Sequence, residues 1–263
     1  MNILDTIIAR KREEVAERKQ GTPVAQLLLS PAFNRATFSL RASLLNENRN
    51  GIIAEFKRRS PSKGVINATA KVEDVTRAYA GNGAAALSIL TDTDFFGGST
   101  ADLVAARFNQ LPILRKDFVV DEYQLFEAKA MGADVILLIA ACLSPEEVYT
   151  LAKKARSLGL EVLLELHAEE ELQHINEFTE IVGINNRDLK TFQVDIDRSL
   201  RMAAQLPTGL LKIAESGIDQ VENVQRFREN GFHGFLIGEQ FMKAPDPAIA
   251  FQQFVKALHK LSE

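Results

Sequence analysis

The sequence predicts a (β/α)₈ barrel, the TIM-barrel architecture, with an N-terminal helical extension. Short apolar runs alternate with amphipathic segments from about residue 51 onward, eight of each, at about 25 residues per unit. The runs are apolar without interruption, as expected for parallel strands that are covered on both faces. No linker or composition shift divides the chain, so we predict one domain over residues 1–263, with the extension at 1–50 and the barrel at 51–263.

The apolar runs give the boundaries that we expect for the barrel elements. The predicted strands are Ile52–Phe56, Ala85–Leu90, Pro112–Leu114, Val135–Ile139, Val162–Leu166, Ile181–Ile184, Leu211–Ala214 and Gly234–Ile237. The predicted helices are Val72–Gly81, Thr100–Gln110, Glu122–Met131, Pro145–Leu158, Ala168–Phe178, Ile196–Gln205, Asp219–Asn230 and Pro247–Leu261. A doubly wound open sheet is the alternative, but no Gly-x-Gly-x-x-Gly motif follows the first strand.

Three of the helices have recognisable start signals. Ser144 precedes Pro145, and serine caps a helix while proline fits its first turn. We expect Asp195 and Asp219 to open two further helices in the same way.

The extension has a helical pattern of its own. Ile3, Leu4, Ile7, Ile8 and Val15 fall near helical spacing, with charged residues between them. One interpretation is a helix that packs across one end of the barrel. The other is that this helix also shapes the substrate pocket, and the sequence leaves both open.

Composition excludes several classes of protein. The chain has 263 residues, a hydrophobic fraction of 46% and a net charge of -4, without the basic stripe of a nucleic-acid binder. No apolar run approaches the roughly 18 residues of a membrane span, and residues 1–20 lack the apolar core of a signal peptide. The single cysteine, Cys142, follows an apolar run, which favours a small core residue over a nucleophile. We therefore expect a cytoplasmic protein with no nucleic-acid or membrane partner.

The first predicted strand ends in charge. Side chains alternate along a strand, so Glu55 and Lys57 point to the same side. Two charges on one face of a buried strand must be paired or used in chemistry. The segment then turns through Ser60-Pro61-Ser62-Lys63-Gly64, which is rich in hydroxyl and backbone donors. The pattern is typical of a strand that delivers functional groups to a pocket.

Polar residues or glycines follow most of the other strands as well. Each alone could be a salt bridge, a turn cap or a solvated charge. In a barrel, however, the carboxyl ends of the strands meet at one mouth, where active sites form. Two lysines and three glutamates in one partly dry volume shift one another's protonation, which predicts an enzyme that uses acid–base chemistry. The residues at or after the strand ends include Glu55, Lys57, Thr91, Asp92, Arg115, Lys116, Asp117, Glu165, Asn185, Arg187, Asp188, Glu215, Ser216, Gly238 and Glu239.

The loops after the seventh and eighth strands suggest a phosphorylated ligand. Such loops commonly hold phosphate through backbone N–H groups, and Gly217 and Gly238 would let the backbone approach closely. The alternative is that both glycines only make turns. The four histidines, His167, His174, His233 and His259, are scattered and lack metal-ligand spacing, so we predict no metal site.

The residues at the strand ends match those of a known family. The chain resembles the indole-3-glycerol phosphate synthase family of tryptophan-pathway barrel enzymes along almost its whole length. Two signatures together are highly specific: Lys57-Arg58-Arg59-Ser60-Pro61-Ser62-Lys63-Gly64 and Ile184-Asn185-Asn186-Arg187-Asp188-Leu189. Leu114-Arg115-Lys116-Asp117-Phe118, Leu164-Glu165 and Ala214-Glu215-Ser216-Gly217 also match. Arg59 departs from the family, which often has a small residue there.

The resemblance implies a reaction without a cofactor. It converts 1-(2-carboxyphenylamino)-1-deoxyribulose 5-phosphate to indole-3-glycerol phosphate, carbon dioxide and water. Lys116 would be the general acid, a role that suits a lysine if burial and neighbouring cations make it release its proton readily. Glu165 would be the base or charge stabiliser, Lys57 would bind the carboxylate and supply a second proton, and Glu55 would orient Lys57.

The resemblance also implies a set of substrate-binding residues. Asn185 and Ser216 would hold the polar chain, with Arg187 and Glu215 as further candidates. The phosphate would be held by Ser60, Gly217, Gly238 and Glu239. Phe96 and Phe118 would wall the aromatic ring, unless they are plain core residues.

Two rival functions remain open, together with the oligomeric state. One rival is another sugar-phosphate barrel enzyme such as phosphoribosylanthranilate isomerase. That chemistry needs a cysteine or aspartate pair and leaves Lys57 and Lys116 unexplained. The other is a catalytically idle scaffold barrel, which a lost Lys116 or Glu165 would indicate, and both are present. We expect a monomer or weak homo-oligomer.

Overall fold

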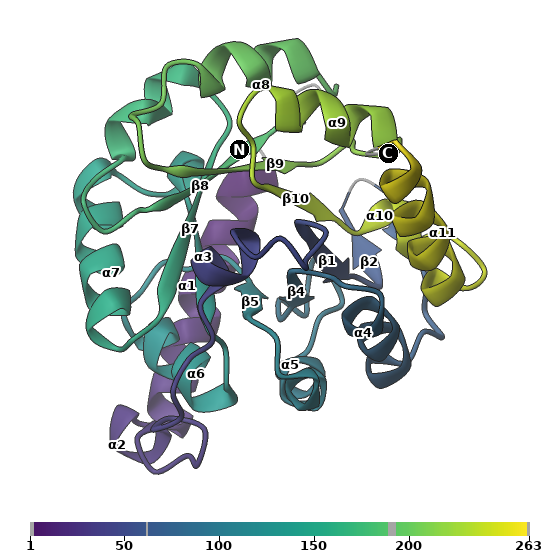
Figure 1. Cartoon of the computed structure of the whole chain (residues 1–263). Helices are drawn as coiled ribbons and strands as arrows, with labels where there is room; N and C mark the ends of the chain where they lie inside the picture. Colours follow the sequence, from purple (N-terminus) through teal and green to yellow (C-terminus); the bar gives the residue numbers. More distant parts are fainter. Residues whose placement is uncertain (1–2, 62, 189–192, 262–263) are drawn as a thin grey trace.

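Eight parallel strands close into a barrel in this computed structural model, which describes residues 3–61, 63–188 and 193–261 (Figure 1). The order around the barrel is β1-β10-β9-β8-β7-β6-β5-β4, and β1 pairs with both β4 and β10. The predicted (β/α)₈ fold is therefore confirmed. The strands are β1 (Ile52–Phe56), β4 (Ala86–Leu90), β5 (Ile113–Lys116), β6 (Val135–Ile139), β7 (Glu161–Leu166), β8 (Ile181–Asn185), β9 (Leu211–Glu215) and β10 (Gly234–Ile237).

Helices surround the barrel and cover its outer face (Figure 1). Apolar side chains on the outward face of the strands pack against them in the larger core cluster. The helices that cover the strands are α4 (Val72–Gly81), α5 (Thr100–Ala106), α6 (Tyr123–Met131), α7 (Pro145–Ser157), α8 (Ile196–Ala203), α9 (Val221–Glu229) and α11 (Pro247–Lys260). The remaining helical elements are α1 (Ile3–Gly21), α2 (Val24–Leu27), α3 (Leu40–Leu44), η1 (Arg107–Asn109), η2 (Ala140–Cys142), η3 (Glu169–His174) and α10 (Glu239–Met242).

Two of the three predicted helix starts are correct. Ser144 forms a full capping box with Glu147, and the Asp195 side chain accepts a hydrogen bond from the Arg198 N–H. Asp219 was wrong as a cap, because α9 begins at Val221 and has no side-chain cap.

The helix expected over Ala168–Phe178 is instead the 3₁₀ helix η3, which ends at His174. Leu172 of η3 packs against the core, as do Ile175 and Phe178 after its end. The turn after the first strand also contains structure that was not predicted, a two-stranded hairpin of β2 (Arg59–Ser60) and β3 (Gly64–Val65). Ser62 and Leu189 of the two signatures lie outside the described residues.

The N-terminal extension covers both ends of the barrel. In Figure 1, α3 lies in front of the barrel opening and α1 passes behind it. Leu40 and Leu44 of α3 join the apolar cluster inside the barrel, and the backbone N–H of Leu40 bonds to Glu161 at the start of β7. At the opposite end, α1 contributes Ile3 and Ile7 to the cavity described below. The extension thus closes the amino-terminal end of the strands and also shapes the pocket.

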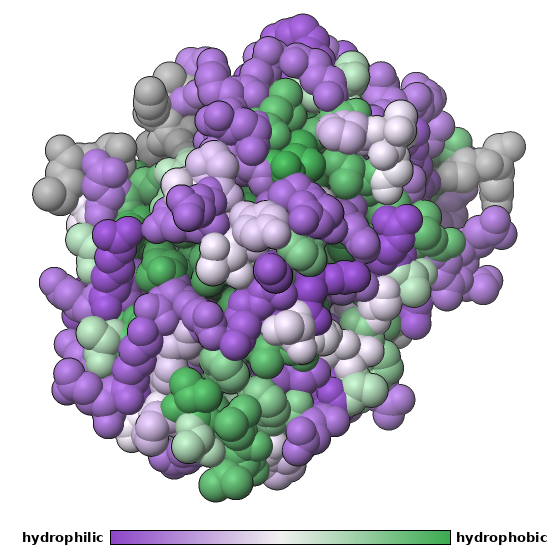
Figure 2. Space-filling model, turned by 90° about the vertical axis from the view of Figure 1, so that its left-hand side faces the viewer, coloured by the Kyte–Doolittle hydropathy of each residue, from purple (hydrophilic) through white to green (hydrophobic). Residues whose placement is uncertain are grey.

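The outer surface is mostly polar on the face seen in Figure 2. Apolar atoms gather near the lower end of that view, at the height where α2 lies in Figure 1, and Leu28 and Leu29 directly after α2 are exposed. In the described part of the chain, no helix is both long enough and apolar enough to cross a membrane.

Candidate active site

The inward face of the strands changes character along the barrel axis. Ile53, Leu114, Leu163 and Ile213 belong to the apolar cluster inside the barrel. Two residues further along the same strands stand Glu55, Lys116, Glu165 and Glu215, all of which line a cavity of about 1290 Å³ at the carboxyl ends. Because side chains alternate with a period of two, each of these four strands supplies one apolar and one charged residue to the interior.

The cavity gathers the residues that the sequence singled out. Every candidate catalytic, substrate-binding and phosphate-binding residue named above lies in its lining. The sequence did not assign a role to several other lining residues, among them Leu4 of α1, His167, Asp188, Asn223, Gln240 and Lys243.

Lys116 lies between two carboxylates at the centre of the site. Its Nζ is 2.9 Å from Oε2 of Glu165 and 2.8 Å from Oε2 of Glu215. The other oxygen of Glu165 accepts a hydrogen bond of 2.9 Å from the Asn185 amide and lies 3.0 Å from Nε2 of His167. Glu165 is therefore held from two sides, by Lys116 and by the Asn185 and His167 pair.

These contacts separate the protonation of the two carboxyls. Burial would raise the pKa of Glu165, but Lys116, His167 and Asn185 hold this pKa well below its usual range. Burial raises the pKa of Glu215 to about 7, against the opposing effect of Lys116 and with the help of Glu165. Two carboxyl groups whose pKa values diverge in this way are suited to different steps of acid–base chemistry.

The surroundings of Lys116 differ from the expectation. Burial favours its neutral form, but Glu165, Glu215 and Glu55 outweigh burial and raise the lysine pKa. Cations that would lower this pKa are not what surrounds Lys116, because β1, β7 and β9 bring the carboxylates of Glu55, Glu165 and Glu215 to this layer. Lys116 is consequently a firmly protonated ammonium in the free protein.

Glu55 and Lys57 form the second ion pair of the site. Lys57 Nζ lies 2.8 Å from Oε1 of Glu55, as their shared side of the strand predicts. Gly238 makes room for this pair, since a Cβ at that position would lie 2.7 Å from Oε1 and 2.8 Å from Cβ of Glu55. A side chain at residue 238 would therefore displace Glu55.

The loop after β9 has an unusual backbone. Ser216 and Gly217 both adopt positive φ angles, of 66° and 67°. For serine this conformation is strained, and the Asn186 amide supports it by a 2.8 Å hydrogen bond to the Ser216 carbonyl. Strained backbone of this kind is concentrated at functional sites.

Gly183 is a positioning residue that the sequence analysis missed. A Cβ there would lie 1.9 Å from Oε1 of Glu215, so only glycine leaves space for this buried carboxyl. The available signal was a glycine inside an otherwise apolar strand, which often marks a close approach by another group.

The two ends of the cavity have different chemistry. Phe96 and Phe118 line one end with their ring centroids 5.9 Å apart, so they are pocket residues. At the other end, Arg187 lies 3.5 Å from the Glu239 carboxylate at the start of α10. Ser60 accepts a hydrogen bond from the Lys63 N–H in the β2–β3 hairpin.

Cys142, His167 and possible metal ligands are the other residues whose chemistry could matter for the site. Burial raises the pKa of the Cys142 thiol, and Cys142 packs against the core, which agrees with the predicted inert role. Across the described residues, no three His, Cys, Asp or Glu side chains are arranged to hold a metal ion. His167 was given no role by the sequence, yet it contacts Glu165.

A barrel with paired lysine–carboxylate groups in a cavity at the carboxyl ends of its strands is typical of an enzyme that uses acid–base chemistry. A model of the family "Indole-3-glycerol phosphate synthase" matches residues 4–254. The chain belongs to the indole-3-glycerol phosphate synthase family.

Relatives of that name are similar over nearly their full length. The protein from Bacteroides thetaiotaomicron is 51% identical, and the alignment covers 98% of this chain and 99% of that one. The protein from Polaromonas sp. strain JS666 is 44% identical, with 96% and 97% covered.

Two solved structures share this fold at much lower sequence identity. A tryptophan synthase α2β2 complex from Pyrococcus furiosus contains a chain with a TM-score of 0.60 and 17% identity, covering 81% of this chain and 99% of that one. The 3-hexulose-6-phosphate synthase from Salmonella typhimurium gives a TM-score of 0.62 at 11% identity, covering 80% and 99%. At these identities the likeness supports the barrel fold alone.

Proposed function

We propose that this chain is a carboxy-lyase of tryptophan biosynthesis that closes the indole ring. Its substrate would be 1-(2-carboxyphenylamino)-1-deoxyribulose 5-phosphate, and its products indole-3-glycerol phosphate, carbon dioxide and water. The observation that carries this proposal is the family match over residues 4–254 together with Lys116 set between two carboxylates in the cavity. No feature of the site favours an isomerase or an idle scaffold.

Lys116 is the proposed proton donor to the ketone oxygen while the aromatic ring carbon attacks the ketone carbon. Its protonated state in the free protein supports this role, because an acid must carry its proton when the substrate arrives. Negative charge that develops on the ketone oxygen attracts the proton of Lys116 and overcomes the attraction of the surrounding carboxylates for the ammonium group. Loss of carbon dioxide then leaves its bonding electrons in the ring system.

Dehydration completes the reaction and needs one acid and one base. We assign the second proton, to the departing hydroxyl group, to Lys57. To Glu165 we assign the removal of one proton from the ring CH2 carbon next to the nitrogen, which forms the double bond of the indole ring. Two protons are delivered and one is recovered, so the reaction of an ionised carboxylate consumes one proton overall. The low pKa of Glu165 keeps it ionised and able to accept, and Glu215, with a pKa near neutrality, is placed to return a proton to Lys116.

The remaining residues are proposed to bind the substrate. Glu55 would orient Lys57, which takes the substrate carboxylate, and Asn185 and Ser216 would hold the polar chain together with Arg187. Phe96 and Phe118 would hold the aromatic ring at one end of the cavity. The phosphate would lie at the other end, on Ser60, Gly217, Gly238 and the backbone N–H of Glu239.

The test is an assay of the purified protein with this substrate, followed by indole fluorescence, alongside Lys116→Ala and Glu165→Gln. We expect turnover by the wild type and a loss of about 10²–10⁴-fold in kcat for Lys116→Ala with KM nearly unchanged, because a proton donor acts mainly in the transition state. Equal losses in binding and turnover would refute the role of Lys116. A folded but silent wild type would refute the activity.

We further propose that residues 1–263 form one domain, and that the protein works in the cytoplasm as a monomer or weak homo-oligomer. The contacts that tie the extension to both ends of the barrel support a single unit, and unfolding in one cooperative transition would test it. Light scattering over a range of concentrations tests the oligomeric state, and cell fractionation the location.

A further inference from the structure

Lys11 occupies a position where its helix should be apolar. The buried face of α1 consists of Ile7, Lys11 and Val15, which recur every four residues. Lys11 is only 1% exposed. A buried ammonium group is costly unless it is paired and hydrogen-bonded, so the partners of Lys11 explain why a lysine stands here.

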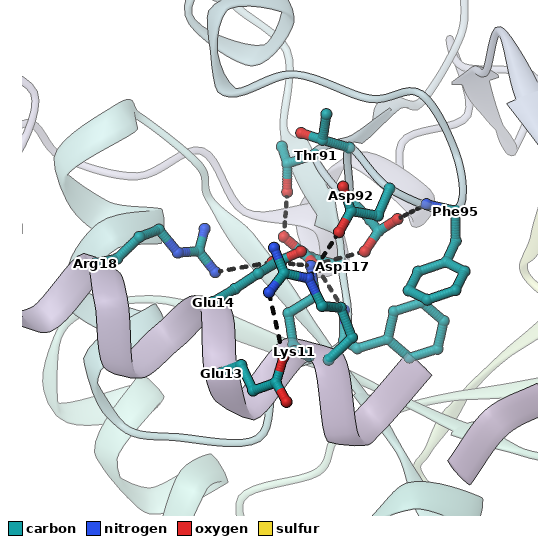
Figure 3. A network of polar contacts seen from close by, with 12 residues as sticks. Lys11, Glu13, Glu14, Arg18, Thr91, Asp92, Phe95 and Asp117 are labelled. Atoms are coloured by element: carbon teal, nitrogen blue, oxygen red, sulfur yellow. Dashed lines mark hydrogen bonds and ion pairs between the residues drawn. The ribbon is translucent and has the colours of Figure 1, made fainter. Parts of the chain in front are cut away.

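Two of those partners are aspartates that closely follow barrel strands. Lys11 Nζ lies 2.7 Å from Oδ2 of Asp92, which follows β4, and 3.1 Å from Oδ1 of Asp117, which follows β5 (Figure 3). Glu14, one turn further along α1, lies 2.8 Å from the same nitrogen. One side chain of the extension thus joins two separate strand ends.

The same two carboxylates hold the backbone of the aromatic wall. Asp92 accepts hydrogen bonds through Oδ1 from the N–H groups of Phe95, at 2.8 Å, and Phe96, at 3.1 Å (Figure 3). Asp117 accepts one of 2.8 Å through Oδ1 from the N–H of Phe118. Lys11 is therefore one residue removed from both rings that line the aromatic end of the cavity.

The barrel fixes these carboxylates from the other side. Asp117 Oδ2 accepts hydrogen bonds from Thr91 and from the fully buried Arg115, at 2.7 and 3.1 Å. The Arg115 and Lys11 cations, with Thr91, overcome burial and lower the pKa of Asp117, so it is ionised. Removing Lys11 would leave Asp117 anchored to the barrel while the link to α1 and Asp92 is lost.

We propose that Lys11 is a positioning residue of the aromatic-ring subsite: it locks α1 and the loops after β4 and β5 into one arrangement, so that Phe96 and Phe118 are in place before the substrate binds. Ile7, one turn before Lys11, lines the same cavity and is fixed by the same contact. The proposal rests on the proposed function, because that function defines which part of the substrate meets the two rings.

The test compares Lys11→Met with Lys19→Met in steady-state turnover. Lys19 lies on the same helix and pairs with Asp121 at 2.6 Å, but it does not line the cavity, so it controls for a lost helix anchor. We expect KM to rise about tenfold for Lys11→Met with kcat within about threefold, the signature of lost uniform binding. A KM equal to that of Lys19→Met would overturn the proposal.

A second readout does not depend on activity. Amide hydrogen exchange in the free protein should be faster at Phe95, Phe96 and Phe118 in Lys11→Met and unchanged there in Lys19→Met. Unchanged exchange would overturn the proposal even if turnover fell. A silent wild type would refute the proposed function and leave this exchange result to decide the role of Lys11.

A double variant separates the positioning role of Lys11 from a loss of folding in Lys11→Met. Lys11→Met leaves Asp92 as an unpaired buried carboxylate, and the double variant Lys11→Met/Asp92→Asn removes that charge while it keeps the Oδ1 acceptor for the loop. We expect the double variant to show the same direction of change in KM and exchange. Wild-type values in the double variant would overturn the proposal.

Discussion

The two ends of the barrel interior are built in opposite ways, although the same strands supply both. At the amino-terminal end, Leu40 and Leu44 of α3 pack into a layer that contains Ile53, Leu163 and Ile213. At the carboxyl end, the residues two positions later on those strands are all glutamates. They share the cavity with Lys57 and Lys116 and lie beneath α1.

This difference separates stability from chemistry within single strands. The apolar layer removes surface from water and stabilises the fold by the hydrophobic effect. Buried ion pairs contribute little net stability, because desolvation of both charges offsets their attraction. The charged layer is therefore explained by what it can do to a substrate, and the following variants test the two layers against each other.

The largest effect is expected from Gly183→Ala in the charged layer. The new methyl group would stand 1.9 Å from Glu215 Oε1 and must push that carboxyl away from Lys116. A displacement of about 1 Å in a catalytic group can cost about 10²-fold, and we expect a loss of that size in kcat. Steady-state kinetics measure it.

Gly81→Ala is the matched control for this substitution. It adds the same methyl group where nothing lies within 4 Å, and its backbone is helical. Full activity is expected there, with a small gain in stability. Wild-type kcat in Gly183→Ala would show that Glu215 does not need its present position.

A substitution in the apolar layer is expected to change the stability of the protein and to leave its activity nearly unchanged. Leu40 of α3 is fully buried, and Leu40→Ala should lower the free energy of unfolding by about 2–4 kcal/mol, because the substitution leaves a cavity. We expect kcat and KM at room temperature within about twofold of the wild type, since Leu40 does not line the active-site cavity. Urea unfolding and the turnover assay together provide the comparison.

Leu45→Ala controls for the truncation itself. Leu45 directly follows α3 and is 51% exposed, so its loss should change stability by less than about 0.5 kcal/mol. A large loss of turnover in Leu40→Ala, at a temperature where the protein is still folded, would contradict the separation of the two ends.

The sequence predicted the strands and the residues at their ends better than the contacts between those residues. The strands were found within one or two residues because their apolar runs are a local pattern. The shared side of Glu55 and Lys57 followed from the period of two, and Lys116 and Glu165 were identified because they lie at the ends of apolar runs. The sequence predicted that lysines and glutamates share this volume, but not that Lys116 lies between Glu165 and Glu215, because these contacts join residues of different strands.

Residues that act across elements escaped detection for the same reason. Gly183 matters through Glu215 of the adjacent strand, and Lys11 through Asp92 and Asp117, about 80 and 106 positions away. Lys11 left one readable signal, a charge at an apolar position of a helix. Asp219 was wrong as a cap because α9 begins at Val221, after Gln220, which makes no side-chain cap hydrogen bond.

The smallest expected effect is a pH dependence that belongs to the charged layer alone. Burial raises the pKa of Glu215 to about 7, above the value of an unfolded glutamate. The folded protein therefore holds this proton more tightly, so the contribution to stability is complete below about pH 4.5 and is lost as the pH rises toward 7.

The variant Glu215→Gln has no such proton. Urea unfolding at pH 5, 6.5 and 8 should show the variant gaining about 1–3 kcal/mol on the wild type over this range, while its turnover falls. The comparison isolates Glu215, because the other titrating groups are present in both proteins. If the difference in the free energy of unfolding between variant and wild type stayed constant from pH 5 to 8, the pKa of Glu215 would not be raised and its ionisation would not destabilise the fold.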